Sequence, residues 1–184
     1  MLLTHESVGD PPRRPASPAR SSVGHDGRVP SCHRVDADDP DIAALTRAVV
    51  QEYAVRYDAP DEVIAPTAAD AAWILLRDDD GAPVGCGAVQ PWSHTVAGAP
   101  SDVGELKRMY VVPAARGRGL SRVLLDALVA VAREQHLAAL VLETGTEQPE
   151  AIGLYTSYGF SPMEVFGPYA DDPRSRCFRL ELAP

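Results

Sequence analysis

The stretch from Val103 to Leu142 constrains the fold more than any other part of the chain. A strand-like run ends at Pro113, and from Leu120 to Ala132 apolar residues recur at i, i+3, i+4, i+7, i+8, i+11 and i+12. Residues 138–142 are then apolar throughout. An amphipathic helix that joins two strands, the second apolar on both faces, is typical of a βαβ crossover with parallel strands. We therefore expect this helix to pack on a sheet that contains both strands.

Shorter segments around this unit predict a single α/β domain. Asp39 and Pro40 are typical of a helix N-cap and first helical residue, and the helix should run to about Tyr57. Pro149 should begin a last helix that Gly159 ends as a C-cap. The fold class that follows is a mixed central sheet of about six or seven strands flanked by helices. Further strands are expected at 31–36, 71–77, 84–92, 160–166 and 177–182.

The N-terminal thirty residues differ in composition from the rest. They contain five prolines among serines, arginines and glycines, with almost no apolar periodicity. Such a segment buries too little surface to offset the entropy of ordering. We expect 1–30 to be a disordered tail and 31–184 to be the folded domain, which agrees with a chain of 184 residues.

Composition excludes several classes of protein. The net charge of −9 argues against a nucleic-acid binder, which needs a basic face. No apolar stretch is long enough for a membrane span, and the N-terminus lacks the apolar core of a signal peptide, so we expect a cytoplasmic protein that binds no membrane. Three cysteines lie far apart without a Cys/His cluster, which predicts no metal site and no disulfide framework.

The segment RGRGLSR between the strand at 103–112 and the long helix predicts an anion site. A glycine-bearing loop that enters a helix N-terminus offers free backbone N–H groups and the positive end of the helix dipole, and arginines add charge. The plainer alternative is a turn shaped by two glycines with solvated arginines. The P-loop and GxGxxG nucleotide motifs do not fit, and a single RG segment in an acidic domain is a poor nucleic-acid signal. The candidate phosphate-binding residues are Arg116, Gly117, Arg118, Gly119, Leu120, Ser121 and Arg122.

This loop resembles the Q/R-x-x-G-x-G/A motif of the GNAT superfamily of N-acetyltransferases. Residues 151–160 (AIGLYTSYGF) likewise resemble the A-x-x-L-Y-x-x-x-G-F signature of that family, and the element order from about residue 31 to 184 is similar to its fold. Two positions depart from the family pattern. Ser121 replaces the usual Gly or Ala, and Gln148 stands where many members have Asn.

The resemblance implies a cosubstrate and a slot for it. Acetyl-CoA would bind without a metal, its pyrophosphate at the loop and its pantetheine arm between splayed fourth and fifth strands. There it would pair with the backbone of Met109, Tyr110 and Val111. Gln148 is a further candidate cofactor-binding residue. The N–H of Val111 would stabilise the oxyanion, and Tyr155 would give a proton to the departing thiolate. The alternative for Tyr155 is a purely structural place in the core.

Two carboxylates compete for the role of general base. Glu105 matches the glutamate of histone-type members and Glu143 that of ribosomal-protein N-terminal members, and Glu105 is slightly favoured. An ion pair with Lys107, Arg108 or another nearby arginine is the structural alternative for either. Strand alternation further predicts one shared face for Glu105, Lys107, Met109 and Val111.

The expected activity is acetyl transfer to a primary amine of a small molecule or peptide by direct attack. Acidic residues could attract a cationic amine, and aromatic residues could line its pocket. A non-catalytic acyl-CoA-binding or sensor domain and a nucleotide-binding regulator remain as alternatives, and a homodimer is compatible with the sequence. The acceptor-pocket candidates, besides the two glutamates, are Asp171, Asp172, Trp92, Phe166 and Tyr169.

Overall fold

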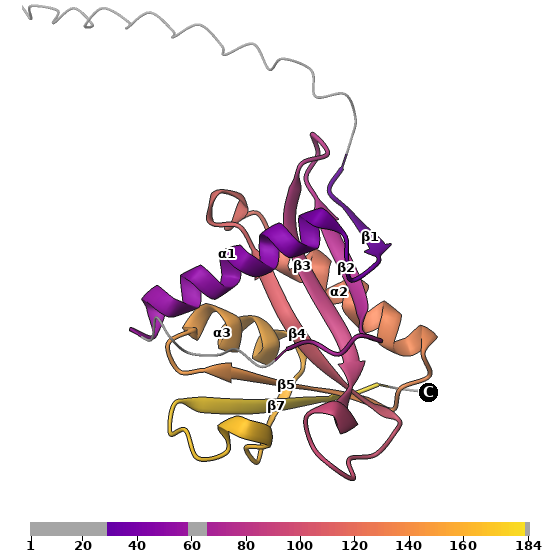
Figure 1. The fold of residues 1–184 in the computed structure, drawn as a ribbon, viewed down its shortest axis with the longest axis vertical. Helices are drawn as coiled ribbons and strands as arrows, with labels where there is room; N and C mark the ends of the chain where they lie inside the picture. The colour runs from indigo at the N-terminus through magenta and orange to yellow at the C-terminus, as the bar shows by residue number, and fades with distance from the viewer. Residues whose placement is uncertain (1–28, 59–65, 183–184) are drawn as a thin grey trace, which may run out of the picture.

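A central sheet with helices on both faces forms the protein in the computed structural model, which describes residues 29–58 and 66–182 (Figure 1). In this part of the chain the sheet order is β1-β2-β3-β4-β5-β7-β6. One apolar cluster joins the sheet to α2 and α3, and a second joins its other face to α1. The strands are β1 (Ser31–Val35), β2 (Ala72–Arg77), β3 (Pro83–Pro91), β4 (Val103–Val111), β5 (Ala139–Gly145), β6 (Ser161–Met163) and β7 (Ser175–Glu181), and the helices are α1 (Pro40–Arg56), α2 (Leu120–Glu134) and α3 (Pro149–Tyr158).

The start of α1 and the end of α3 lie at the residues that the sequence predicted as caps. The Asp39 carboxylate accepts hydrogen bonds from the N–H groups of Asp41, at 2.8 Å, and Ile42, at 3.4 Å, and Pro40 is the first helical residue of α1. Gly159 ends α3 with φ of 115°, a left-handed conformation that favours glycine. Both predicted caps are confirmed.

The parallel ladder between β4 and β5 is short. Its last pair is Glu105 with Val141, yet β4 continues to Val111 and β5 to Gly145. Beyond that pair β5 is hydrogen-bonded to β7 on its other side, so the two parallel strands separate. The predicted splay between the fourth and fifth strands is confirmed.

A bulge in β4 overturns the predicted alternation. Arg108 has a φ of 55°, and the register with β3 shifts so that Arg108 and Met109 both lie opposite Gly87. Lys107 consequently stays on the α1 face of the sheet, whereas Met109 packs into the cluster beneath α2. The prediction that all four alternate residues share one face is wrong, because the extra residue inverts the order of the faces.

Some strand boundaries also differ from expectation. β6 spans three residues rather than the whole of 160–166, whereas β5 extends past Leu142 to Gly145 and β7 begins at Ser175. The disordered tail expected at 1–30 falls, apart from Val29 and Pro30, outside the described residues. Within the described ranges, no helix combines the length and the apolar character that crossing a membrane requires.

Candidate functional site

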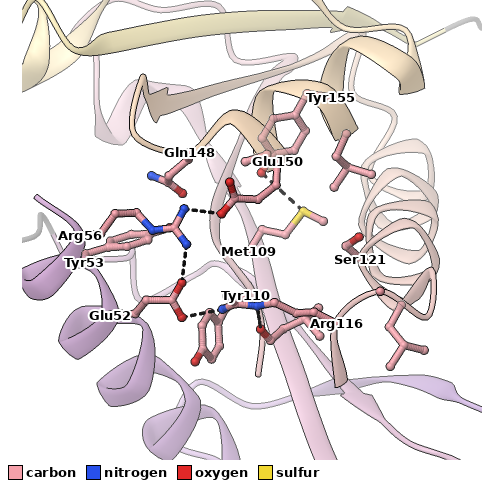
Figure 2. Close-up of a pocket in the computed structure, with 15 residues that line it drawn as sticks. Glu52, Tyr53, Arg56, Met109, Tyr110, Arg116, Ser121, Gln148, Glu150 and Tyr155 are labelled. Carbon is pink, nitrogen blue, oxygen red and sulfur yellow. Dashed lines mark hydrogen bonds and ion pairs between the residues drawn. The ribbon is translucent and has the colours of Figure 1, made fainter. Parts of the chain in front are cut away.

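A cavity of about 230 Å³ lies where β4, α1, α3 and the loop before α2 meet (Figure 2). Its lining also takes in Glu52, Tyr53 and Arg56 from α1 and Glu150 from α3, which the sequence analysis did not single out. Most of the predicted cofactor residues line it together with Tyr155. These are Met109, Tyr110, Val111, Arg116, Gly117, Leu120, Ser121 and Gln148.

The backbone of Val111 faces the gap between the splayed strands. The next residue, Val112, donates its N–H to the carbonyl of Val84 on β3 at 2.9 Å. Because successive residues of a strand point their backbone groups to opposite sides, the N–H and carbonyl of Val111 point away from β3. Arg116 Nε donates to that carbonyl at 2.8 Å, while the N–H is aimed at the gap.

The glycines of the loop set the entry to α2. Gly117 and Gly119 have φ of 77° and 78°, in the left-handed region, and Gly119 is the N-cap residue of α2 without a side chain to cap the helix. The first turn therefore presents its backbone donors on the side where Leu120 and Ser121 line the cavity. This geometry suits an anion.

The three arginines of the loop have different surroundings. Arg116 lines the cavity and pairs with Glu52 at 2.5 Å. Arg118 instead holds Asp78, in the β2–β3 turn, through two hydrogen bonds of 2.5 and 2.8 Å. Arg122 lies 5.0 Å from the ring centroid of an α3 tyrosine. Only Arg116 of the three contributes to the lining of this cavity.

A chain of ion pairs crosses the mouth of the site from loop to α1 to α3 (Figure 2). Glu52 joins Arg116 to Arg56, whose second contact is with Glu150. Burial raises the pKa of Glu52, but the hydrogen bonds and charges of the two arginines outweigh it and hold that pKa below its usual value. The i, i+4 spacing of Glu52 and Arg56 was readable in the sequence, whereas their distant partners were not.

Tyr155 is buried with its hydroxyl toward β4. Its O–H donates to the thioether Sδ of Met109 at 3.6 Å (Figure 2). Burial raises the pKa of Tyr155 far above its usual value, and the charge of Glu143 adds to the rise. The hydroxyl therefore keeps its proton at neutral pH, and it faces a sulfur atom inside the cavity.

Gln148 is held in place from α1. Its Nε2 donates to the hydroxyl of Tyr57 at 2.8 Å. That hydroxyl packs directly on the end of β5, where a Cβ added to Gly145 would lie 2.0 Å from it. Tyr53, one turn earlier, is edge-on to Tyr57, and burial raises its pKa to about 12. The last turn of α1 thus closes over the ends of β4 and β5.

Glu105 is fully buried and has three hydrogen-bond donors. It accepts from Gln90 Nε2 at 3.0 Å, from the Thr95 hydroxyl, and from Lys107 Nζ at 3.1 Å. The ion pair with Lys107 is therefore present, in agreement with the structural alternative for this glutamate. Glu105 faces α1, on the opposite side of the sheet from Met109.

Glu143 lies on β5 two residues beyond the last β4–β5 pair, where the gap is open. The Ser175 hydroxyl donates to its Oε1 at 2.9 Å. Burial raises the pKa of Glu143, against the opposing effects of the Ser175 hydrogen bond and the charge of Lys107. The charge of Glu143 in turn raises the pKa of Tyr155 and Tyr53.

A second cavity, of about 420 Å³, opens on the α1 side of β4. Among its lining residues are Gln90, His94, Thr95 and Lys107. The aromatic residues predicted for an acceptor pocket are not among them. Trp92 and Phe166 instead stack edge to face at 5.2 Å in an apolar cluster, Asp172 pairs with Arg174 at 2.8 Å, Asp171 is exposed, and the side chain of Tyr169 lies outside the described residues.

Comparison with known proteins agrees with this geometry. The chain is 43% identical over 101 residues to the IAA acetyltransferase of Azospirillum brasilense, a match that spans 55% of this chain and 62% of that protein. It is 33% identical to the uncharacterised N-acetyltransferase YjgM of Escherichia coli strain K12, over 69% of this chain and 78% of that one.

A solved structure is similar over most of its length. It is a Klebsiella pneumoniae protein assigned as an acyl-CoA N-acyltransferase, with 31% identity and a TM-score of 0.68 over 84% of this chain and 98% of that one. The acetyltransferase (GNAT) family itself matches residues 42–160, from α1 to the end of α3, which includes the loop, the splayed strands and Tyr155. The chain therefore belongs to the acetyltransferase (GNAT) family.

Proposed function

We propose that this protein transfers an acetyl group from acetyl-CoA to a primary amine by direct attack. The single observation that supports this most is the early end of the β4–β5 ladder at Glu105 and Val141. It opens a slot that Val111 and Tyr155 line, and the Glu143 carboxylate, two residues beyond the last ladder pair, is near enough for its charge to raise the pKa of Tyr155. Acetyl-CoA supplies the activated thioester, and an arginine and helix N-terminus at the loop suit its phosphates.

Each residue then has one task. Glu143 accepts a proton from the amine, whose nitrogen forms a bond to the acetyl carbon while the carbon–sulfur bond breaks. The Val111 N–H donates to the carbonyl oxygen as negative charge develops there. The Tyr155 O–H, which stays protonated at neutral pH, gives its proton to the departing sulfur. The cosubstrate residues in this proposal are those of the cavity lining, with Arg118 and Arg122 supporting the loop from outside it.

The surroundings of the two carboxylates favour Glu143 over Glu105 as the base. Glu105 has no exposed surface and is occupied by three donors, one of them an ammonium group. Among the described residues, Glu143 has one side-chain donor, Ser175, and its pKa is raised, so it takes a proton more readily than an ordinary glutamate. We also propose that the protein acts in the cytoplasm and that the reaction needs no metal ion.

The test compares two isosteric variants under conditions in which chemistry limits the rate. Glu143→Gln should lower turnover about 10²-fold or more at neutral pH with CoA affinity nearly unchanged, because only proton removal is lost. Thiol release measures turnover, and titration calorimetry measures CoA binding. Glu105→Gln is the matched control, and it should lose less turnover. A larger loss in Glu105→Gln would assign the base to Glu105, and CoA binding without thiol release for any amine would favour an acyl-CoA sensor.

A further inference from the structure

The described residues that line the second cavity include a lysine, Lys107, and no arginine, aspartate or glutamate. Lys107 is the one lysine or arginine among these lining residues, and its side chain is only 13% exposed. His94 also lines the cavity and pairs with Asp70 at 3.2 Å. In a chain with a net charge of −9, an enclosed ammonium group at a cavity wall is a local feature that selects for an anion.

The ammonium group is held in position from behind. Glu105, fully buried, takes one of its three N–H donors at 3.1 Å. Gln90 fixes that carboxylate in turn, since its Nε2 donates to Glu105 and its Oε1 accepts from the N–H of Ala68 at 2.9 Å. The remaining donors of Lys107 are thus set beside the Thr95 hydroxyl at the cavity wall.

The strand register relates this cation to the proposed base. The β4–β5 pairs end at Glu105 and Val141, and the same register carried on by two residues sets Lys107 opposite Glu143 across the gap. The charge of Lys107 lowers the pKa of Glu143, in agreement with this register. A carboxylate on β5 and an ammonium on β4 therefore face each other with the gap between them.

We propose, on the basis of the proposed function, that the acceptor is an amino acid, whose amine meets Glu143 and whose carboxylate binds Lys107 in the second cavity. A zwitterion complements both groups at once, whereas a simple amine leaves Lys107 without an anion other than Glu105. A lysine offers a compact point charge with three N–H donors, and an acceptor carboxylate can accept from those that Glu105 does not take.

The experiment uses matched amines with and without a carboxylate. With the full chain and saturating acetyl-CoA, kcat/KM is measured by thiol release for L-leucine against 3-methylbutylamine and for L-phenylalanine against 2-phenylethylamine. The amino acid of each pair should be preferred by roughly 10- to 100-fold, the value of one charge-assisted hydrogen bond. Lys107→Gln should remove most of this preference. The readout is the ratio of kcat/KM within each pair and not the absolute rate, because the charge of Lys107 also lowers the pKa of Glu143. Lys107→Arg should keep most of the preference, and His94→Gln should leave it unchanged.

A binding measurement keeps the test independent of turnover and of folding. The double variant Lys107→Gln/Glu105→Gln leaves no buried unpaired charge, so it avoids the cost of stranding Glu105. With CoA bound, N-acetyl-L-phenylalanine should raise the thermal midpoint of the unaltered protein more than N-acetyl-2-phenylethylamine does, and the double variant should lose this difference. Equal responses to the two compounds, or a preference that survives Lys107→Gln, would overturn the carboxylate subsite. CoA binding without thiol release for any of the four amines would instead count against acetyl transfer, and the product measurement would still decide on the subsite.

Discussion

Glu105 and Glu143 are the same side chain in two different environments. Glu105 is buried and accepts hydrogen bonds from an ammonium, an amide and a hydroxyl group. Glu143 lies near the end of β5, beyond the β4–β5 ladder, and accepts from the Ser175 hydroxyl at 2.9 Å. The sequence showed that both were candidates but could not foresee these environments, because two of the three donors to Glu105, Gln90 and Thr95, come from β3 and its following loop. The bulge at Arg108 was equally hidden, since nothing in that residue type signals a positive φ.

At the residue scale, Ser175→Ala should change how kcat depends on pH. The Ser175 hydroxyl bonds to the ionised carboxylate and favours it, so its loss raises the pKa of Glu143 further. A base must be deprotonated, so the acid limb of kcat should move to higher pH, with a severalfold loss at slightly acid pH that disappears on the alkaline side. The measurement is kcat against pH at saturating acceptor, with the exposed Ser101→Ala as control. An unchanged acid limb of kcat would mean that Glu143 is not the base, or that Ser175 does not affect its pKa.

Elements were easier to predict than their ends. The long helix α2 follows from its periodicity alone, and Leu124 and Leu128 are fully buried as that pattern requires. Leu125, outside the pattern, is also fully buried, whereas Val123, inside it, is 40% exposed. β6 was overestimated, because the strand stops after Met163 and the chain then turns Phe166 into the apolar cluster with Trp92. A tertiary contact of this kind leaves no periodic signal in the sequence.

The closeness of α2 to β3 gives a test at the scale of elements. A Cβ at Gly87 would lie 2.7 Å from Cδ1 of Leu128, which is fully buried. Gly87→Ala should lower the free energy of unfolding by about 1–3 kcal/mol through overpacking, and Leu128→Ala by about 2–5 kcal/mol through the cavity it leaves. The double variant should lose less than the sum, because the added methyl group occupies part of that cavity.

Urea unfolding measures all three variants. Gly153→Ala on α3 is the matched control, since nothing lies within 4 Å of its Cβ position and the residue is helical. That substitution should stabilise the protein by about 0.5–1 kcal/mol. If the losses in unfolding free energy at Gly87 and Leu128 are strictly additive, the added methyl group does not fill the cavity left at Leu128, and α2 instead moves away from β3.

At the scale of the whole molecule, one side chain links three separate segments. Glu52 on α1 pairs with Arg116 of the loop and, through Arg56, reaches Glu150 at the start of α3. These residues are up to about a hundred positions apart, so their meeting could not be predicted from spacing. The order of the strands and the splay, by contrast, follow from the βαβ unit and the family resemblance.

This link should make stability depend on pH in a defined direction. The pKa of Glu52 lies below its ordinary value of 4.5 in the folded state, so its stabilising effect is complete above that pH and is lost as the pH falls through the folded pKa. Glu52→Gln should therefore lower the thermal midpoint at pH 7, and the difference from the unaltered protein should shrink on acidification below 4.5. Glu134→Gln, exposed and 4.0 Å from Arg34, is the control. A difference independent of pH would mean that packing, not charge, is lost.

The early end of the β4–β5 ladder has a consequence for how the sheet is completed. It creates a sheet edge in the interior of the molecule, where no second protein chain can reach it and only a narrow ligand with amide groups of its own can pair with it. Under the proposed function, a pantetheine arm in this slot would act as one further strand. Folding and occupancy would then be linked, since a ligand that binds only the folded state adds RT ln(1 + [L]/Kd) to the free energy of unfolding. Acetyl-CoA would thereby stabilise the fold to an extent that grows with its concentration.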